Sequence, residues 1–205
     1  QIQLGTQRSL SGVEVEAVIL FTDIRGFTRM SETKLPYDVV YILNKYFKFV
    51  VESIEDNGGR VDKFIGDGVM AIFDISNNMN ENCKNALVAS RKISKSLKLL
   101  NEELKSELDE DLKIGIGVHA GTVILGKMGF GQSSSETAIG DSVNIASRLE
   151  QLTKEHSCEI MISKKLADLA RINQKNFSIL KTKIRGKEDE MDALFMEQAS
   201  EIQIN

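Results

Sequence analysis

The apolar residues of the chain follow two spacings, one typical of strands and one typical of helices. Between Val15 and Phe21 nearly every residue is apolar, which is typical of a strand buried on both faces. After Pro36 the apolar residues recur every three or four positions and predict a helix, which Asn57-Gly58-Gly59 ends. The segment from Arg60 to Phe73 predicts a hairpin with Asp67-Gly68 as its turn.

The rest of the chain continues this mixture of elements. A long helix is predicted over residues 83–108, and alternating apolar residues from Leu112 to Ala120 predict a strand. Gly121-Thr122 is expected to turn the chain into a second strand, from Val123 to Lys127. The remaining predicted elements are a strand at 137–139, a helix from 140 to about 155, a strand at 159–162, a helix at 164–170 and a final β-pair at 177–185 and 191–197.

Strands and helices alternate without a strict repeat, and hairpins lie among them. This order favours an α+β fold, with one sheet and helices packed on a face, over a doubly wound parallel sheet. We expect one domain over residues 14–197, preceded by a linker or leader at 1–13 and followed by a tail at 198–205. Because the chain does not begin with Met, we expect it to be a domain of a longer protein that has an upstream sensor or regulatory region.

Composition narrows the classes of function only a little. The 205 residues are sufficient for a substantial core, and a formal charge of −4 provides no general attraction to nucleic acid or anionic lipid. No apolar run approaches the ~20 residues of a membrane span, so an anchor of the full-length protein would lie outside this segment. Cys83 and Cys158 lie far apart without metal-ligand spacing, which favours a reducing, cytoplasmic setting.

Two aspartates at the ends of predicted strands are the strongest candidates for chemistry. Asp23 follows the first apolar run, Asp67 lies in the hairpin, and a glycine comes close behind each. Carboxylate oxygens presented in this way suit Mg²⁺ or Mn²⁺, which fill their other positions with water and substrate phosphate. The backbone carbonyl of Ile24 is a candidate for a further ligand. The alternative is that Asp23 caps a turn and Asp67 is an ordinary turn residue. We favour a metal–phosphate enzyme.

A helix face and a strand lysine are candidates for nucleotide contacts. Asn144 and Arg148 are four residues apart on a predicted helix, where amide and guanidinium groups can hold ribose and phosphate oxygens together. The alternative is an ordinary surface pair, with Arg148 joined to Glu150 or Glu155. Lys63 can donate to an acceptor on a base, or it can be a solvated strand lysine.

Three motifs resemble those of the class III nucleotidyl cyclase catalytic domain, in the same order and at similar spacing. They are FTDIRGFT at 21–28, KFIGDG at 63–68 and IGDSVNIASRLE at 139–150. The resemblance covers about residues 14–197. It implies a ferredoxin-like βαββαβ core with additional helices and a C-terminal β-pair. It also implies a head-to-tail homodimer with its sites at the interface.

The resemblance implies a role for each candidate residue. Asp23 and Asp67, with the carbonyl of Ile24, would bind two divalent metal ions, Mg²⁺ or Mn²⁺. Asn144 would orient the ribose and Arg148 would neutralise charge in the transition state, both from the partner subunit.

The positions that read the base in this family are matched by Lys63 and Thr137. This pair suits adenine, because a lysine donates to ring N1 and a threonine oxygen accepts from the exocyclic amine. The triphosphate-binding lysine of the family is matched by Arg185. The arm before Thr137, residues 131–135, has no charged side chain, whereas bacterial relatives often carry a basic residue there.

The resemblance therefore predicts an adenylate cyclase for intracellular signalling. Such an enzyme converts ATP to 3′,5′-cyclic AMP and pyrophosphate by attack of the ribose 3′-hydroxyl on the α-phosphate. One alternative is a guanylate cyclase. The other is a pseudo-catalytic module that binds nucleotide and dimerises for an attached sensor, and the uncharged arm is the observation that suggests it. No nucleic-acid partner is expected.

Overall fold

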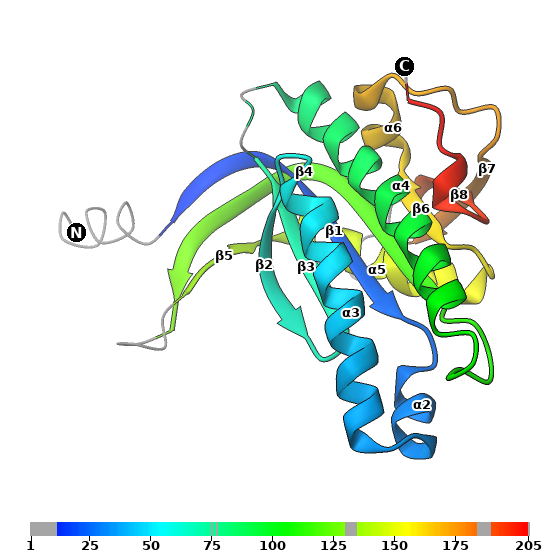
Figure 1. The fold of residues 1–205 in the computed structure, drawn as a ribbon. Helices are drawn as coiled ribbons and strands as arrows, with labels where there is room; N and C mark the ends of the chain where they lie inside the picture. The colour runs from blue at the N-terminus through cyan, green and yellow to red at the C-terminus, as the bar shows by residue number, and fades with distance from the viewer. Residues whose placement is uncertain (1–11, 75, 77, 130–134, 184–189, 205) are drawn as a thin grey trace.

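The computed structural model describes residues 12–74, 76, 78–129, 135–183 and 190–204. These residues form one mixed sheet with α-helices on both of its faces (Figure 1). The strands are β1 (Val13–Ile24), β2 (Arg60–Ile65), β3 (Gly68–Phe73), β4 (Ile114–Met128), β5 (Ser135–Ile139), β6 (Ile160–Ser163), β7 (Ser178–Lys183) and β8 (Glu190–Met196). The helices are α2 (Phe27–Thr33), α3 (Pro36–Glu55), α4 (Met79–Glu103), α5 (Asp141–Glu155) and α6 (Lys164–Ala170), with a short 3₁₀ turn, η2 (Ala199–Glu201).

The first part of the sheet has the ferredoxin-like arrangement that the resemblance implied. Its elements run β1, α3, β2, β3, α4, β4 along the chain, and its strands lie in the order β2-β3-β1-β4. The sheet continues through β6, β8 and β7, and β5 pairs with β4. The predicted α+β class, the βαββαβ core and the C-terminal β-pair are therefore confirmed.

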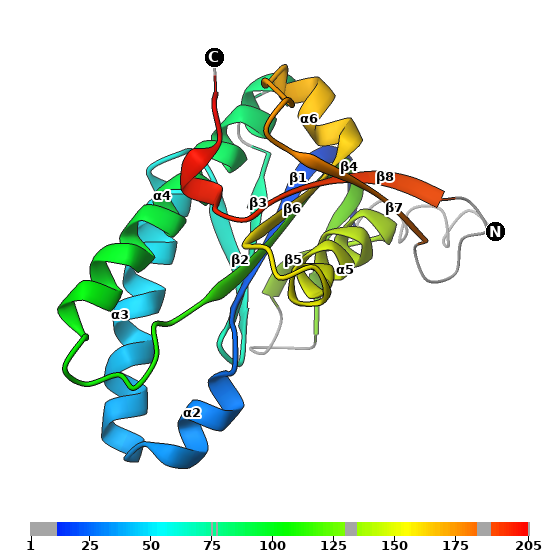
Figure 2. The same cartoon turned by 90° about the vertical axis from the view of Figure 1, so that its right-hand side faces the viewer.

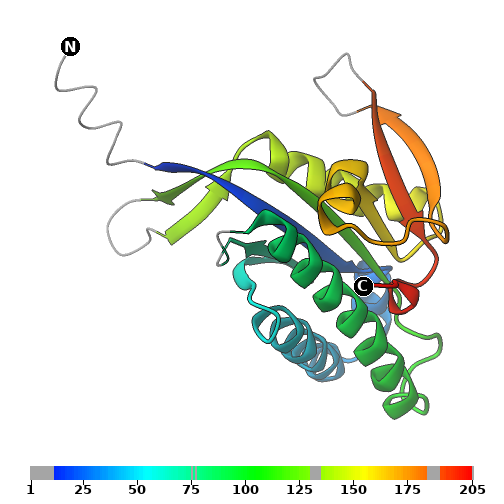
Figure 3. The same ribbon diagram turned by 90° about the horizontal axis from the view of Figure 1, so that it is seen from above.

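The sheet separates two hydrophobic layers, one on each of its faces, and helices cover both. Seen from above, α3 and α4 lie on one side and α5 on the other (Figure 3). Val18 and Leu20 of β1 belong to the hydrophobic cluster formed with α3 and α4. Ala17 and Ile19 belong to a second cluster, which includes Ala146 of α5. Both faces of β1 are thus covered, which explains its continuous apolar sequence.

The central strand β4 is one continuous strand, so the predicted turn at Gly121-Thr122 is wrong. β1 begins at Val13, earlier than the apolar run suggests, and pairs with β4 along its whole length. Within this pairing Glu16 lies opposite Thr122, whose hydroxyl donates a hydrogen bond to the Glu16 carboxylate. The ladder with β1 supplies partners for the backbone at these positions and keeps it extended.

The β2–β3 hairpin has two local features that position side chains. Its two-residue turn is Gly66-Asp67, one residue earlier than predicted, and Gly66 has a φ of 63°, which favours glycine. A β-bulge interrupts the pairing between Val61 and Lys63. The bulge therefore falls at Asp62.

The C-terminal strands β8 and β7 extend the sheet beyond β6, and β7 is the last strand on this side (Figure 2). β7 and β8 pair antiparallel, and β8 also pairs with β6. Of the predicted linker at 1–13, residues 1–11 lie outside the described residues, and Val13 is already part of β1. Residues 131–134 of the arm predicted at 131–135 and Arg185 also lie outside the described residues, whereas Ser135 begins β5. No helix in the described part of the chain is long and apolar enough to cross a membrane.

Candidate active site

The two candidate metal-binding aspartates lie side by side at the end of the central strands. In the antiparallel β1–β3 pair Thr22 lies opposite Val69, so the next residue along β1, Asp23, is beside the start of β3. A methyl group added to Gly68 would stand 3.6 Å from Asp23 Oδ1. Asp67 directly precedes this glycine. Strand register therefore brings together two carboxylates that are separated by 44 positions in the sequence.

The environment of this pair makes it a poor place for two bare negative charges. Burial raises the pKa of Asp23 to about 8, and the hydrogen bond and repulsion from Asp67, together with repulsion from Glu150, act in the same direction. The Ile24 amide donates to Asp23 Oδ1 at 3.0 Å and opposes the shift. Asp67 Oδ2 is buried, with no hydrogen-bond partner among the described residues.

A divalent cation resolves both problems, because it neutralises the paired charges and provides a partner for the buried oxygen. The donor set consists of hard oxygens, as Mg²⁺ and Mn²⁺ require. Among the residues that the structure describes, no group of three or more His, Cys, Asp and Glu side chains gathers to form a protein-only metal cage. Water and substrate phosphate would complete the coordination.

Hydrogen bonds of Arg25 fix the backbone that carries Asp23. The guanidinium of Arg25 donates to Thr153 Oγ1 at 2.5 Å and to the carbonyl oxygens of Cys158 at 2.9 Å and Ile114 at 3.2 Å. These acceptors belong to α5, the segment before β6 and the start of β4. Sequence reasoning gave Arg25 no role, although it lies two residues after Asp23. It ties the end of β1 to three neighbouring segments.

The two predicted base-reading residues meet at a third residue that sequence reasoning missed. Thr137 Oγ1 of β5 donates a hydrogen bond to Asp62 Oδ2 at 2.6 Å. Lys63 Nζ lies 3.3 Å from the same oxygen. The Asp62 side chain has no exposed surface, and 43% of the Lys63 side chain is exposed. The structure thus joins Lys63 and Thr137 through one buried carboxylate.

Asn144 and Arg148 lie one turn apart on α5, as predicted. Asn144 is exposed, and Arg148 Nη1 lies 3.2 Å from Glu155 Oε1. The ion pair between Arg148 and Glu155, one of the two considered from the sequence, is therefore present within one chain. Both of its side chains are more than a third exposed, so the pair contributes little to stability and leaves Arg148 available to other partners.

Close packing holds α5 against the sheet. A methyl group at Gly117 of β4 would stand 2.3 Å from the Glu150 nitrogen and 2.4 Å from the Ala146 carbonyl oxygen, so only glycine fits. This approach brings Glu150 near the aspartate pair. Burial raises the pKa of Glu150, Asp67 adds to the shift, and Arg25 opposes it. The sequence did not predict that Glu150 influences the aspartate pair, because its distance from Asp23 depends on how α5 packs on the sheet.

The fold and the carboxylate pair together define a catalytic domain of the class III nucleotidyl cyclase type. The chain belongs to the family described as the adenylate and guanylate cyclase catalytic domain, whose family model matches residues 13–198. The family expected from the three motifs is confirmed.

Two curated relatives are named as adenylate cyclases. The chain is 38% identical over 172 residues to adenylate cyclase of Anabaena cylindrica, covering 79% of this chain and 33% of the relative. It is 41% identical over 145 residues to the terminal-differentiation specific adenylate cyclase of Dictyostelium discoideum, covering 71% of this chain and 7% of the relative. The chain therefore spans a third or less of the length of these relatives.

Solved structures show the same fold. The guanylyl cyclase Cya2 has a TM-score of 0.79 and 26% identity, covering 90% of this chain and 93% of that one. A bacterial light-regulated adenylyl cyclase has a TM-score of 0.78 and 29% identity, with coverages of 91% and 53%. The adenylyl cyclase CyaB from P. aeruginosa has a TM-score of 0.83 at 24% identity, with coverages of 96% and 97%.

Proposed function

We propose that this chain is an adenylate cyclase domain, which converts ATP to 3′,5′-cyclic AMP and pyrophosphate. The carboxylate pair of Asp23 and Asp67 is the observation that carries the proposal, because a half-buried pair with a buried, unpartnered oxygen suits a metal-bound polyphosphate. The names of the two curated relatives support adenylate chemistry. In the reaction the ribose 3′-oxygen bonds to the α-phosphorus while the bond from that phosphorus to pyrophosphate breaks.

Asp23, Asp67 and the carbonyl of Ile24 would hold two divalent ions, Mg²⁺ or Mn²⁺. Such ions acidify the attacking hydroxyl and neutralise charge that develops on the phosphates. The chain's own contribution is to hold the carboxylates rigidly, through the β1–β3 register and the hydrogen bonds of Arg25. Rigid placement matters because a displacement of about 1 Å costs roughly 100-fold in rate.

Lys63 and Thr137 would read the base, and their common contact with Asp62 supports a joint role. Lysine donates to N1 of adenine, and threonine accepts from its exocyclic amine. Asn144 and Arg148 would act on the ribose and the transition-state charge, and Arg185 would bind the triphosphate. We place the active domain in the cytoplasm, under the control of a regulatory region elsewhere in the full-length protein.

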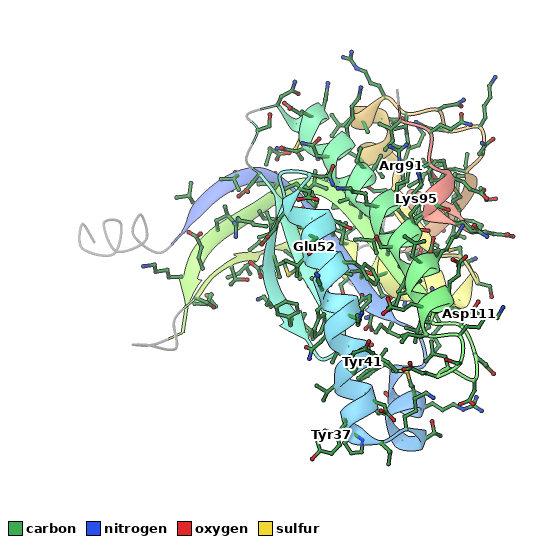
Figure 4. The ribbon with its side chains drawn as sticks, viewed as in Figure 1. Tyr37, Tyr41, Glu52, Arg91, Lys95 and Asp111 are labelled. Atoms are coloured by element: carbon green, nitrogen blue, oxygen red, sulfur yellow. The ribbon has the colours of Figure 1, made fainter. Side chains whose placement is uncertain are left out.

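The site would be assembled from two copies of the chain in a head-to-tail homodimer. Large apolar side chains are exposed in the single chain, which supports such an interface. Tyr37 is 89% exposed and Tyr41 46% exposed at the start of α3 (Figure 4), and Phe64 is 52% exposed next to Lys63. Large exposed apolar side chains often belong to contact surfaces. Arg148 would then leave Glu155 to reach the nucleotide bound by the partner.

Product analysis tests this proposal directly. The purified chain is incubated with ATP or GTP in Mg²⁺ or Mn²⁺ over a series of protein concentrations, and products are separated by chromatography. We expect cyclic AMP from ATP, with a specific rate that rises with protein concentration. Asp67→Ala should lower the rate at least ~100-fold, because loss of even an outer partner of a metal ligand costs about 10–100-fold.

Asp74→Asn is a matched control, because Asp74 follows β3 in the same hairpin and pairs with Arg60 away from the site. It should retain the wild-type rate. Cyclic GMP as the main product would instead identify a guanylate cyclase. Nucleotide binding by a confirmed dimer, with no cyclic product under any condition, would identify a pseudo-catalytic module.

A further inference from the structure

We propose that Asp62 is a specificity-determining residue of this domain, acting through Thr137. Its carboxylate accepts a hydrogen bond from the Thr137 hydroxyl and so leaves the threonine oxygen as an acceptor toward the base. The pocket then accepts an amine at purine C6 and rejects a carbonyl there. This inference rests on the proposed role of Lys63 and Thr137 in binding the base.

The contacts of Asp62 are those of a buried polar group with a fixed task. One oxygen, Oδ2, accepts from Thr137 Oγ1 at 2.6 Å and lies 3.3 Å from Lys63 Nζ. The other, Oδ1, is buried and has no hydrogen-bond partner within the described part of the chain. A side chain without exposed surface normally avoids such an arrangement, because an unpaired buried carboxylate oxygen is costly. The cost indicates that the carboxylate is held here for function.

The β-bulge explains how two successive residues reach the same place. In a regular strand the side chains of Asp62 and Lys63 would point to opposite faces of the sheet. The pairing of β2 with β3 shifts between Val61 and Lys63, so Asp62 is the extra residue of the bulge. A bulge redirects a side chain in this way, and here it places Asp62 between Lys63 and Thr137 of β5, a strand that pairs with β4 and not with β2.

Hydrogen-bond chemistry then determines which base fits. A threonine hydroxyl has one proton, and an ionised carboxylate can only accept. Once that proton is donated to Asp62, Thr137 has only lone pairs to offer. The amine at C6 of adenine donates to them, whereas the carbonyl at C6 of guanine or hypoxanthine meets them as a second acceptor. Without Asp62 the hydroxyl would rotate freely and serve either group.

The test compares three nucleotides that differ at C6. ATP has the amine, and purine riboside triphosphate has no group there but keeps N1 as an acceptor. Inosine triphosphate has the carbonyl and also a hydrogen on N1, so its difference from ATP includes the contact with Lys63, whereas purine riboside triphosphate isolates the contact with Thr137. For wild type we expect kcat/KM to fall from ATP to purine riboside triphosphate and again to inosine triphosphate. Asp62→Asn should reduce the ATP preference over both about 10-fold or more, since its amide can donate to Thr137 as well as accept.

Two further variants separate positioning from simple loss of structure. Thr137→Val removes the hydroxyl, so adding Asp62→Asn to it should leave the preference between the nucleotides unchanged. Asp74→Asn removes a carboxylate that pairs with Arg60 at 3.3 Å and should retain the wild-type preference. An Asp62→Asn chain that keeps the wild-type preference would overturn the inference. An equal change with and without the Thr137 hydroxyl would also overturn it.

Binding of nucleotides that cannot cyclise keeps this test distinct from that of the proposed function. Calorimetry with 3′-deoxy-ATP and 3′-deoxyinosine triphosphate, in Mn²⁺, measures the preference for the C6 amine. The preference is expressed as the Kd of the inosine nucleotide divided by the Kd of the ATP analogue. If wild type produces no cyclic nucleotide but Asp62→Asn still lowers this ratio, the proposed activity is wrong and the role of Asp62 stands. If wild type cyclises ATP and the ratio does not change, only the role of Asp62 is wrong. A wild-type chain that binds neither nucleotide would overturn both.

Discussion

Asp23 shows how a single residue can be costly for folding and useful for function. Its carboxyl is partly buried beside Asp67, and this environment raises its pKa to about 8. In the metal-free chain it therefore holds a proton at neutral pH, while in the unfolded chain it has lost one. A bound cation changes this balance, because it favours the ionised form. The residue is better suited to a metal complex than to the free protein.

The stability of the metal-free chain should depend on pH through this group. Between about pH 4 and pH 8 the native state binds a proton that the unfolded state does not bind, so stability falls as pH rises through this window. Asp23→Asn removes the effect. In EDTA, we expect the melting temperature of Asp23→Asn minus that of wild type to increase from pH 5 to pH 8. Thermal melts at four pH values measure the difference.

Asp56→Asn serves as the control for this experiment, because Asp56 is exposed and pairs with Lys92 at the surface. Its melting temperature should follow that of wild type at every pH. In Mn²⁺ the wild-type chain should be stabilised more at pH 8 than at pH 6, because at the higher pH less work is needed to remove the Asp23 proton. A difference between wild type and Asp23→Asn that stays constant with pH would contradict the assignment.

The residues of the candidate site differ in how far the sequence alone reveals them. Asp23 and Asp67 are recognisable, because each follows a strand pattern and precedes a glycine, although only strand register shows that they touch. Asp62 is adjacent to Lys63 and was still missed. A regular strand would put the two on opposite faces, and no local pattern announces the bulge that brings them together.

Element boundaries show where sequence patterns fail for physical reasons. The helix α2 was not predicted, because none of its residues is buried and no side chain caps its start. Phe27 and Met30 pack against the core, but in a helix of seven residues one such apolar pair without a cap is a weak signal. The false turn in β4 has the opposite cause, since Gly121-Thr122 favours a turn locally and the long pairing with β1 overrides it.

The packing of α5 on β4 gives a prediction about stability. Gly117→Ala places a methyl group 2.3 Å from the backbone nitrogen of Glu150, which cannot move independently of the helix. Overpacking of this kind costs about 1–3 kcal/mol, and each kcal/mol lowers the melting temperature of a chain this size by about 2–4 °C. We therefore expect a loss of several degrees, measured by calorimetry or circular dichroism.

Gly115→Ala is the matched comparison on the same strand. Its methyl group would stand 2.5 Å from Glu150 Oε1 and 2.5 Å from Thr153 Oγ1, both of which are side-chain atoms and not backbone atoms of α5. The loss of melting temperature should be smaller than for Gly117→Ala. If the two variants melt together, backbone contact at Gly117 does not limit the approach of the helix.

At the scale of the whole molecule, the candidate residues form two groups within one chain. One is the aspartate pair and the other surrounds Asp62, whereas Arg148 belongs to neither group and pairs with Glu155. A site shared between subunits predicts rescue by mixing. Asp67→Ala and Arg148→Ala chains should each be inactive alone. Mixed in equal amounts, they should recover about a quarter of the wild-type rate, because half of the dimers are mixed and each has one intact site.

Glu155→Gln controls for the loss of the ion pair in the Arg148 variant and should remain active. Dimer formation by the mixed chains is checked by sedimentation. If confirmed mixed dimers show no recovery, catalysis is not shared between subunits in the proposed way.

The pairing of β1 with β4 also governs when the site can form during synthesis. Val13 pairs with Leu125 and Ile24 with Ile114, so β1 waits for a partner made on the order of 100 residues later. At about 5–20 residues per second, a ribosome needs roughly 5–20 seconds to supply it. The local β2–β3 hairpin can close early and carry Asp67 with it. Until β4 emerges, the edge of β1 that β4 later covers remains unpaired, and a nascent chain in this state is a natural substrate for chaperones.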